Sequence, residues 1–104
     1  MPELKTATLA NIQSYVIELE NERRFIDQTV LQKCLLLGEE VGELFKAIRL
    51  TEKISTDKNS QSFQIGEELA DILIYLCAIA NRCEIDLEDA FRKKEEINKR
   101  RVWE

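Results

Sequence analysis

The stretch that decides the fold runs from residue 65 to residue 83 and reads IGEELADILIYLCAIANRC. Its apolar residues recur in alternating steps of four and three. They are Ile65, Leu69, Ile72, Leu76, Ile79 and Cys83. This spacing places them along one face of an α-helix, as in the seam of a helical bundle. The stretch therefore predicts a long helix that packs against another helix.

A second stretch, residues 30–48, repeats the same spacing. Its seam residues are Val30, Cys34, Leu37, Val41, Leu44 and Ile48. Just before it, Thr29 and Gln32 fit a capping box at the start of a helix. The segment from Thr51 to Ser62 is polar and is predicted to be a loop. We therefore expect the two helices to form an antiparallel hairpin.

Two further helices flank the hairpin. Apolar residues at helical spacing predict one from about Thr6 to Glu22, followed by a polar connector from Asn21 to Gln28. Asp86 fits an N-cap and predicts a last helix from Leu87 to about Arg101. Only 3 Gly and 1 Pro occur in 104 residues, which favours long helices over many short strands. We therefore expect an all-α fold in a single domain, residues 1–104: a four-helix-type bundle with a central antiparallel hairpin.

Composition excludes several classes of function. The formal net charge of −5 disfavours binding to a nucleic acid polymer, whereas a free nucleotide that brings its own cations remains compatible. The chain has no histidine, which excludes His-based metal sites and Ser-His or Cys-His nucleophile systems. Chemistry at this protein must therefore use other side chains.

Sequence features also bear on where the protein works. The first five residues contain no apolar signal-peptide core, and the longest apolar run, Ile72–Ala80, is too short to span a bilayer. Cys34, Cys77 and Cys83 form no C-x-x-C pair and are odd in number, which favours reduced core thiols over a disulfide frame or a zinc site. We therefore expect a cytoplasmic protein that does not bind a membrane.

Acidic residues are distributed differently on the hairpin and on the last helix. In the last helix, acids such as Asp89 have a base four residues later, the spacing of exposed ion pairs. The hairpin acids Glu40, Glu43, Glu68 and Asp71 have an apolar or aromatic residue there instead. Because like charges on one side of a helix repel each other, something other than a local base must compensate them.

The hairpin acids also occupy matching positions. Glu40 and Glu43 each directly precede a seam residue, as Glu68 and Asp71 do in the other helix. Equivalent flanks face each other in an antiparallel hairpin. Glu40 and Asp71 are equally far along the chain from the point between residues 55 and 56, and so are Glu43 and Glu68. The sequence thus predicts four carboxylates at one height on one edge of the hairpin.

Such a group of carboxylates predicts a metal site. Four carboxylates this close cannot all stay ionised without cations, and an oxygen-only cluster suits a hard ion such as Mg²⁺ or Mn²⁺. The alternative is that two acidic surface stripes coincide by chance. The missing local bases and the matched heights favour the metal site.

The last helix carries a polar motif of a different kind. Lys94, Asn98 and Arg101 share one face with Leu87 and Phe91, and none of the three has an acid four residues before it. Two interpretations stay open. The motif is either a phosphate clamp that closes over the metal site or a basic helix end that complements its own dipole.

Together these residues make a recognisable pattern. It consists of Glu39-Glu40-x-x-Glu43, then Glu68-x-x-Asp71, then Lys94-x-x-x-Asn98-x-x-Arg101. The pattern resembles that of the MazG family of nucleoside triphosphate pyrophosphohydrolases, in the all-α group that includes dimeric dUTPases and phosphoribosyl-ATP pyrophosphohydrolases. The resemblance covers roughly residues Leu36 to Trp103.

The resemblance implies a hydrolase acting on acid anhydrides. It would convert a (deoxy)nucleoside triphosphate to the monophosphate and pyrophosphate, in nucleotide-pool housecleaning, with Mg²⁺ or alternatively Mn²⁺. The implied metal ligands, also catalytic residues, are Glu40, Glu43, Glu68 and Asp71. Glu39, the first acid of the motif, is implied to be catalytic by binding metal or orienting the attacking water. The implied phosphate or sugar contacts are Lys94, Asn98 and Arg101.

The resemblance also implies partners. Family members pair their hairpins, so we expect a homodimer or homotetramer that oligomerises through its helices. The base is implied to lie around Gln13 and Asn21–Asp27, where Phe25 either stacks on the base or caps the bundle. Trp103 either stacks on a base or anchors the tail, and we expect it to anchor the tail. The alternative function is a non-catalytic helical module that binds nucleotide or protein, but the intact acids of the motif argue against lost catalysis.

Overall fold

Four α-helices make up most of the chain. The structure is a computed structural model and describes residue 4, residues 7–53 and residues 58–101. Its helices are α1 (Leu9–Arg23), α2 (Val30–Lys53), α3 (Lys58–Arg82) and α4 (Leu87–Lys99). These described ranges contain no strand. The prediction of an all-α fold is confirmed, while the prediction for Trp103 lies outside the described residues.

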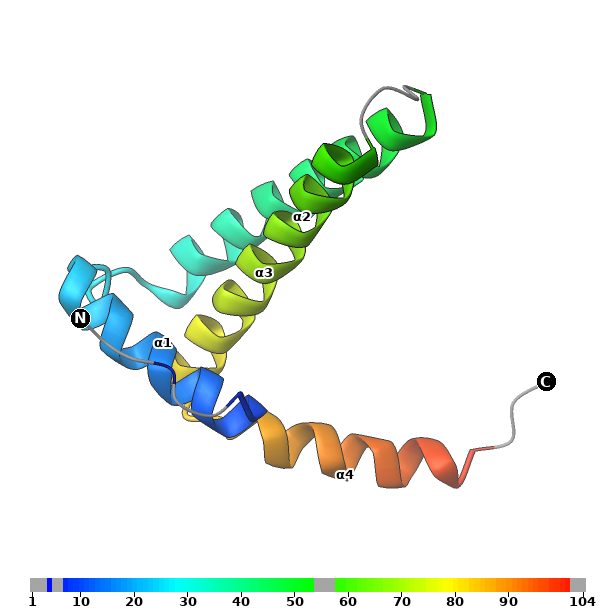
Figure 1. Ribbon diagram of the computed structural model, residues 1–104. Helices are drawn as coiled ribbons and strands as arrows, with labels where there is room; N and C mark the ends of the chain where they lie inside the picture. The colour runs from blue at the N-terminus through cyan, green and yellow to red at the C-terminus, as the bar shows by residue number, and fades with distance from the viewer. Residues whose placement is uncertain (1–3, 5–6, 54–57, 102–104) are drawn as a thin grey trace.

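The helices α2 and α3 run side by side as an antiparallel hairpin (Figure 1). The capping box at the start of α2 is confirmed by two reciprocal hydrogen bonds. The Gln32 backbone N–H donates to Thr29 Oγ1 at 3.1 Å, and the Thr29 backbone N–H donates to Gln32 Oε1 at 2.8 Å. These bonds satisfy two N–H groups that a helix start otherwise leaves unpaired, which is why α2 begins here.

The predicted loop from Thr51 to Ser62 is wrong at both ends, because α2 continues to Lys53 and α3 already begins at Lys58. No Gly or Pro occurs in this segment to stop a helix. The Thr51 hydroxyl donates to the Ala47 carbonyl at 2.9 Å, so this polar side chain bonds within the helix. Residues 54–57 lie outside the described residues.

The buried core lies where α1 crosses α3. Val16 and Leu19 of α1 pack against Cys77 and Ala78 of α3, and all four are buried. The helix α1 begins three residues later than predicted because Thr8 caps it, accepting from the Asn11 backbone N–H at 3.1 Å. This contact fixes the angle between α1 and the hairpin.

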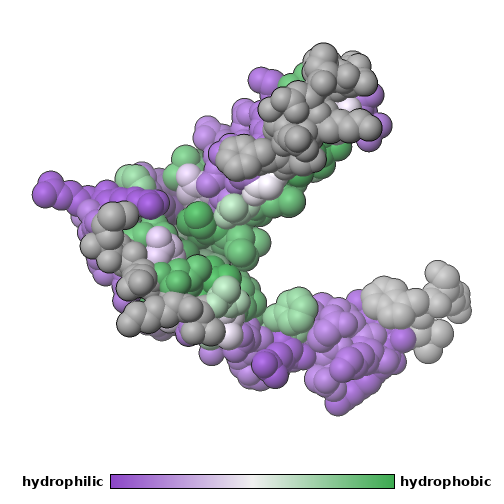
Figure 2. Space-filling model, viewed as in Figure 1, coloured by the Kyte–Doolittle hydropathy of each residue, from purple (hydrophilic) through white to green (hydrophobic). Residues whose placement is uncertain are grey.

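The predicted hairpin seams are only partly covered within one chain. Leu69 is 53 % exposed, and Ile48 and Leu76 are also exposed. The reason is that α2 covers one side of α3, whereas α1 covers only its last turns (Figure 1). In Figure 2, green apolar side chains gather on the inner side of the bend, where the hairpin meets α1.

The helix α4 packs against α1 and extends away from the hairpin (Figure 1). The predicted N-cap is confirmed, since Asp86 Oδ1 accepts from the Asp89 backbone N–H at 3.0 Å. Gln13 of α1 fixes the turn before α4: its Nε2 donates to the Ile85 carbonyl at 2.7 Å, and its Oε1 accepts from the Leu87 backbone N–H at 2.9 Å. The side-chain amide of Gln13 therefore uses its hydrogen bonds to hold the turn before α4.

Two further expectations concern the described helices. None of them is both long enough and apolar enough to cross a membrane. Cys34, Cys77 and Cys83 are all free, but the expectation of core thiols is wrong for Cys34 and Cys83, which are exposed because no further helix among the described residues covers them. Burial raises the pKa of the Cys77 thiol, which keeps it protonated in the core.

Candidate functional site

Three of the four predicted hairpin carboxylates meet between α2 and α3. Glu40, Glu68 and Asp71 each contribute an oxygen, and the three oxygens lie within 4.8 Å of one another. Glu40 and Glu68 are half-buried, whereas Asp71 is exposed. The antiparallel hairpin thus brings acids from positions far apart in the sequence into one cluster.

The carboxylates of the cluster lie close enough together to raise the pKa of Glu40. A hydrogen bond with Glu68, followed by burial and the charges of Glu68, Asp71 and Glu43, raises the pKa of Glu40 to about 7. Without a cation, the cluster therefore retains a proton near neutral pH, because protonation of Glu40 reduces the repulsion among the carboxylates. A bound divalent cation would take over that role.

The other two acids of the motif lie beside the cluster. Glu43 is exposed and close enough for its charge to act on Glu40, although it is not one of the three residues that converge. Glu39 is exposed, and its charge contributes to raising the pKa of Tyr75. Both acids therefore face the same region as the cluster from the flank of α2.

The donor set fits a hard divalent cation. Glu68 Oε2 is buried and has no hydrogen-bond partner among the described residues. A buried carboxylate oxygen without a partner is costly, and coordination of a cation removes that cost. Mg²⁺ and Mn²⁺ prefer carboxylate oxygens, and the described residues around the cluster offer no softer ligand.

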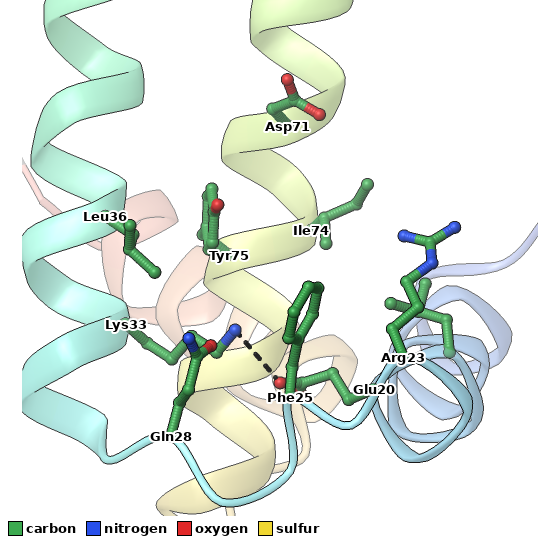
Figure 3. A pocket seen from close by; sticks show the side chains of 10 residues that line it. Glu20, Arg23, Phe25, Gln28, Lys33, Leu36, Asp71, Ile74 and Tyr75 are labelled. Carbon is green, nitrogen blue, oxygen red and sulfur yellow. Dashed lines mark ion pairs between the residues drawn. The ribbon is translucent and has the colours of Figure 1, made fainter.

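A pocket of about 340 Å³ adjoins the cluster, and Asp71 belongs to both. In Figure 3, Asp71 lies at one end of the pocket and Glu20, Gln28 and Lys33 lie at the other. Asp71 is exposed, while Glu20 is 2 % exposed and Lys33 is 3 % exposed. The pocket therefore opens at the acids and closes at a buried charged end.

Aromatic rings line the middle of the pocket. Phe25 comes from the connector and Tyr75 from α3 (Figure 3). Burial, followed by the charges of Glu40, Asp71 and Glu39, raises the pKa of Tyr75, so its phenol stays a hydrogen-bond donor. Such a pocket offers flat apolar faces next to a cation site, which suits a planar ring attached to an anionic group.

The closed end is built on a buried ion network that the sequence analysis missed. Glu20 of α1 pairs with Lys33 of α2 at 3.3 Å and with Arg82 of α3 at 2.7 Å. Burial raises the pKa of Glu20, but hydrogen bonds and charges from Arg82 and Lys33 outweigh it and bring the pKa below its ordinary value of 4.5. Glu20 is therefore an ionised carboxylate shared by two cations.

One signal could have found part of this network. Lys33 directly precedes the seam residue Cys34, and Arg82 directly precedes the seam residue Cys83. Both cations therefore lie on the same flanks as the acids, near the start of α2 and at the end of α3. Glu20 carried no comparable signal, because its burial depends on the angle at which α1 crosses α3.

The motif on α4 does not join the cluster within one chain. Lys94 is exposed, and the half-buried Asn98 donates through Nδ2 to Glu95 Oε2 at 3.4 Å. Arg101 follows the end of α4 and is exposed. Because α4 extends away from the hairpin (Figure 1), none of the three residues lines the pocket beside Asp71.

Comparison with known proteins identifies relatives of this chain. A family model described as the MazG nucleotide pyrophosphohydrolase domain matches residues 28–102. The human protein dCTP pyrophosphatase 1 is 36 % identical over 102 residues, which cover 90 % of this chain and 58 % of that protein. The proteins of the same name from mouse and cattle are 35 % and 36 % identical. The chain spans a little over half the length of these relatives.

The matched segment contains the acid cluster and part of the pocket, whereas Glu20 and Phe25 precede it. It includes α2, α3 and α4, and so the acid cluster, Lys33, Tyr75 and Arg82. The match covers more than half of the chain and agrees with the resemblance based on the acidic motif. The chain therefore belongs to the MazG nucleotide pyrophosphohydrolase domain family.

Proposed function

We propose that the chain is a Mg²⁺-dependent nucleoside triphosphate pyrophosphohydrolase. The reaction consumes one water, breaks the anhydride bond between the α and β phosphates and yields a nucleoside monophosphate and pyrophosphate. One observation carries the proposal: Asp71 belongs both to the carboxylate cluster and to the wall of the aromatic pocket. A nucleotide with its base in the pocket would extend its phosphates toward the acids.

The acids would hold the cation and the water. Glu40, Glu68 and Asp71 would be the first ligands, and Glu43 would be a fourth carboxylate on the same flank. When bound, Mg²⁺ supplies charge neutralisation for the phosphates and lowers the pKa of a water molecule. Glu39 lies at the edge of this region, where its carboxylate can accept a hydrogen bond from the attacking water and orient it.

The motif on α4 would bind phosphate or sugar in an assembly rather than within one chain. Lys94, Asn98 and Arg101 offer two cations and an amide at helical spacing. Within one chain α4 extends away from the acids, so these residues reach a cluster only when a second copy brings its hairpin close. The proposed phosphate contact therefore requires an oligomer.

An oligomer is also supported by the apolar surface of the hairpin. Leu31 is 69 % exposed and Leu35 is 65 % exposed, one turn apart on α2. Phe45 on α2 and Leu69 on α3 are exposed as well. Several large exposed apolar side chains on two helices are typical of an interface. We propose that the chain forms a homodimer or homotetramer through these helices.

The relatives suggest which nucleotide to test first. They are named dCTP pyrophosphatase 1, so we propose dCTP as the first substrate for this chain. Removal of such a nucleotide from the pool would make the protein a housecleaning enzyme of the cytoplasm. The free thiols of Cys34 and Cys83, both exposed, suit that compartment.

A pyrophosphate-release assay on a panel of nucleoside triphosphates tests this function. We expect release that requires Mg²⁺ or Mn²⁺ and disappears when both are chelated. Glu40→Gln should abolish it, while Glu96→Gln, which changes an exposed acid on α4, should not. If no nucleotide is hydrolysed with either metal, the enzyme proposal is wrong and the non-catalytic module becomes the better interpretation.

A further inference from the structure

Lys33 is a buried cation at the closed end of the pocket, opposite Asp71 (Figure 3), and it has no role in the proposed hydrolysis of the phosphates. Its Nζ lies 3.3 Å from Glu20 Oε2, 5.2 Å from the centroid of the Phe25 ring and 5.5 Å from the centroid of the Tyr75 ring. An ammonium has three hydrogens to donate. Among the described residues, Glu20 is the only acceptor paired with it, so donor capacity remains for a ligand.

Gln28 places an unpaired acceptor in the same part of the pocket. Its Oε1 is buried and has no hydrogen-bond partner among the described residues. In Figure 3, the Gln28 amide lies beside the Lys33 side chain. Because a buried acceptor without a donor is unfavourable, a ligand that brings a donor to Gln28 gains affinity.

Arg82 keeps this end of the pocket ordered before a ligand arrives. Its Nε donates to the Gln28 carbonyl at 2.7 Å, and its Nη2 donates to the Phe25 carbonyl at 3.0 Å. Both bonds tie the connector between α1 and α2 to α3. The two connector residues that line the pocket are therefore positioned in advance, which favours selective binding.

We propose that Lys33 and Gln28 read the edge of the base, with Lys33 Nζ as donor and Gln28 Oε1 as acceptor, and so select a cytosine nucleotide. The proposal rests on the hydrolase function and names the residues that choose its substrate. Cytosine carries an amino group, an unprotonated ring nitrogen and a carbonyl oxygen in a row. The amino group matches Gln28 Oε1, and the other two atoms match the Lys33 ammonium.

Other bases match this end less well. Uracil and thymine carry a carbonyl in place of the amino group and a hydrogen on the ring nitrogen. Their carbonyl would face Gln28 Oε1 and their N–H would face the Lys33 ammonium, and both contacts are repulsive. Adenine offers the ammonium a ring nitrogen but no adjacent carbonyl. A site built to hydrogen-bond one pattern strongly rejects an analogue that leaves its buried groups unpaired.

Two variants test the proposal in the full chain. Lys33→Met keeps the length of the side chain, and Glu20 keeps its ion pair with Arg82 at 2.7 Å. Gln28→Met removes the acceptor while keeping similar volume. Lys99→Met is the matched control, because Lys99 is exposed on α4 and pairs only with Glu96 among the described residues.

Calorimetric titration measures the binding of the products dCMP and dUMP in the presence of Mg²⁺, and this readout does not depend on turnover. We expect the wild type to prefer dCMP and Lys33→Met to weaken dCMP binding by about 10- to 100-fold, the loss of one hydrogen bond to a charged group. With dCTP as substrate, Lys33→Met should raise KM by a similar factor and leave kcat nearly unchanged. Lys99→Met should match the wild type in both assays.

The outcomes separate this inference from the proposed function. Equal affinity of the wild type for dCMP and dUMP, or a preference retained in both variants, would overturn the reading of the base. No pyrophosphate release together with a preference for dCMP contradicts the hydrolase and leaves the base reading supported. If Lys33→Met does not fold, as judged by circular dichroism, Gln28→Met decides, because Gln28 is only half-buried on the connector.

Discussion

Arg82 on α3 contacts Glu20 on α1 at two points: Nη1 lies 2.8 Å from Oε1, and Nη2 lies 2.7 Å from Oε2. Paired hydrogen bonds between a guanidinium and a carboxylate are among the strong polar contacts in proteins. The same guanidinium also donates to the carbonyls of Gln28, Phe25 and Ala78. One side chain thus joins α1, the connector and α3 beneath the pocket.

Arg82→Met should therefore destabilise the fold. Removing one partner of a buried ion pair typically costs about 3–5 kcal/mol, and we expect the lower end because Lys33 still pairs with Glu20. Urea unfolding followed by circular dichroism measures the change. Lys93→Met is the control, since it removes an exposed pair with Asp89 and should leave the midpoint unchanged. Equal midpoints for both variants would contradict this role of Arg82.

Glu20 should make stability depend on pH in the acid range. Its pKa in the folded state lies below the ordinary value of 4.5. The unfolded state therefore binds a proton first as pH falls, so the contribution of Glu20 is complete above about pH 4.5 and is lost as pH drops through the folded-state pKa. Unfolding free energies from pH 3 to 7 for the wild type and Glu20→Gln measure this. Their difference should shrink toward low pH, and a constant difference would contradict the assignment.

The fold was predictable from sequence where capping side chains mark the start of a helix. Thr29 with Gln32 and Asp86 with Asp89 form caps that are readable from residue types three positions apart. The loop after Thr51 was mispredicted because polar composition alone does not end a helix. The crossing of α1 over α3 depends on contacts between distant residues, which periodicity does not encode.

The candidate site was predictable where it lies on regular helices. Glu40 and Asp71 could be matched because positions along an antiparallel hairpin follow a simple register. The ion network at the closed end was not predictable, because the burial of Glu20 follows from the crossing of α1. On α4, Lys99 contacts Glu96 at 3.5 Å although Glu95 lies four residues before it, because i,i+3 and i,i+4 neighbours compete on a helix.

Metal binding should distinguish the converging acids from their neighbour Glu43. Glu68→Gln removes an oxygen of the three-residue group, whereas Glu43 lies outside it. We expect Mn²⁺ to bind the wild type and raise its thermal midpoint, since a ligand at 100 times its Kd stabilises the folded state by about 2.7 kcal/mol. Glu68→Gln should lose this shift and Glu43→Gln should keep part of it. Calorimetric titration that ranks the two variants in the opposite order would require a different ligand set.

Self-association should depend on the exposed apolar turn of α2. We expect light scattering to show a dimer or tetramer for the wild type, and a smaller species for Leu35→Glu, because a carboxylate buried in an apolar interface is strongly unfavourable. Asn11→Glu, an exposed change on α1, is the control and should keep the wild-type mass. A monomeric wild type would contradict the assembly and also the proposed reach of α4 to the acids.

Kinetics should separate the acids from the basic motif of α4. If Asp71 helps to hold the cation that stabilises developing charge, Asp71→Asn should lower kcat by on the order of 100-fold or more. If Lys94 binds phosphate equally in the ground and transition states, Lys94→Ala should mainly raise KM.

Lys99→Ala is the matched control for this comparison. It removes an exposed pair with Glu96, so it should change neither parameter appreciably. Steady-state rates of pyrophosphate release with saturating Mg²⁺ give both constants for each variant. If Lys99→Ala impaired turnover as much as Lys94→Ala while Asp71→Asn kept its kcat, the site assignment would be wrong. The acids and the α4 motif would then belong to an interaction surface, because substitution of a catalytic carboxylate must lower kcat.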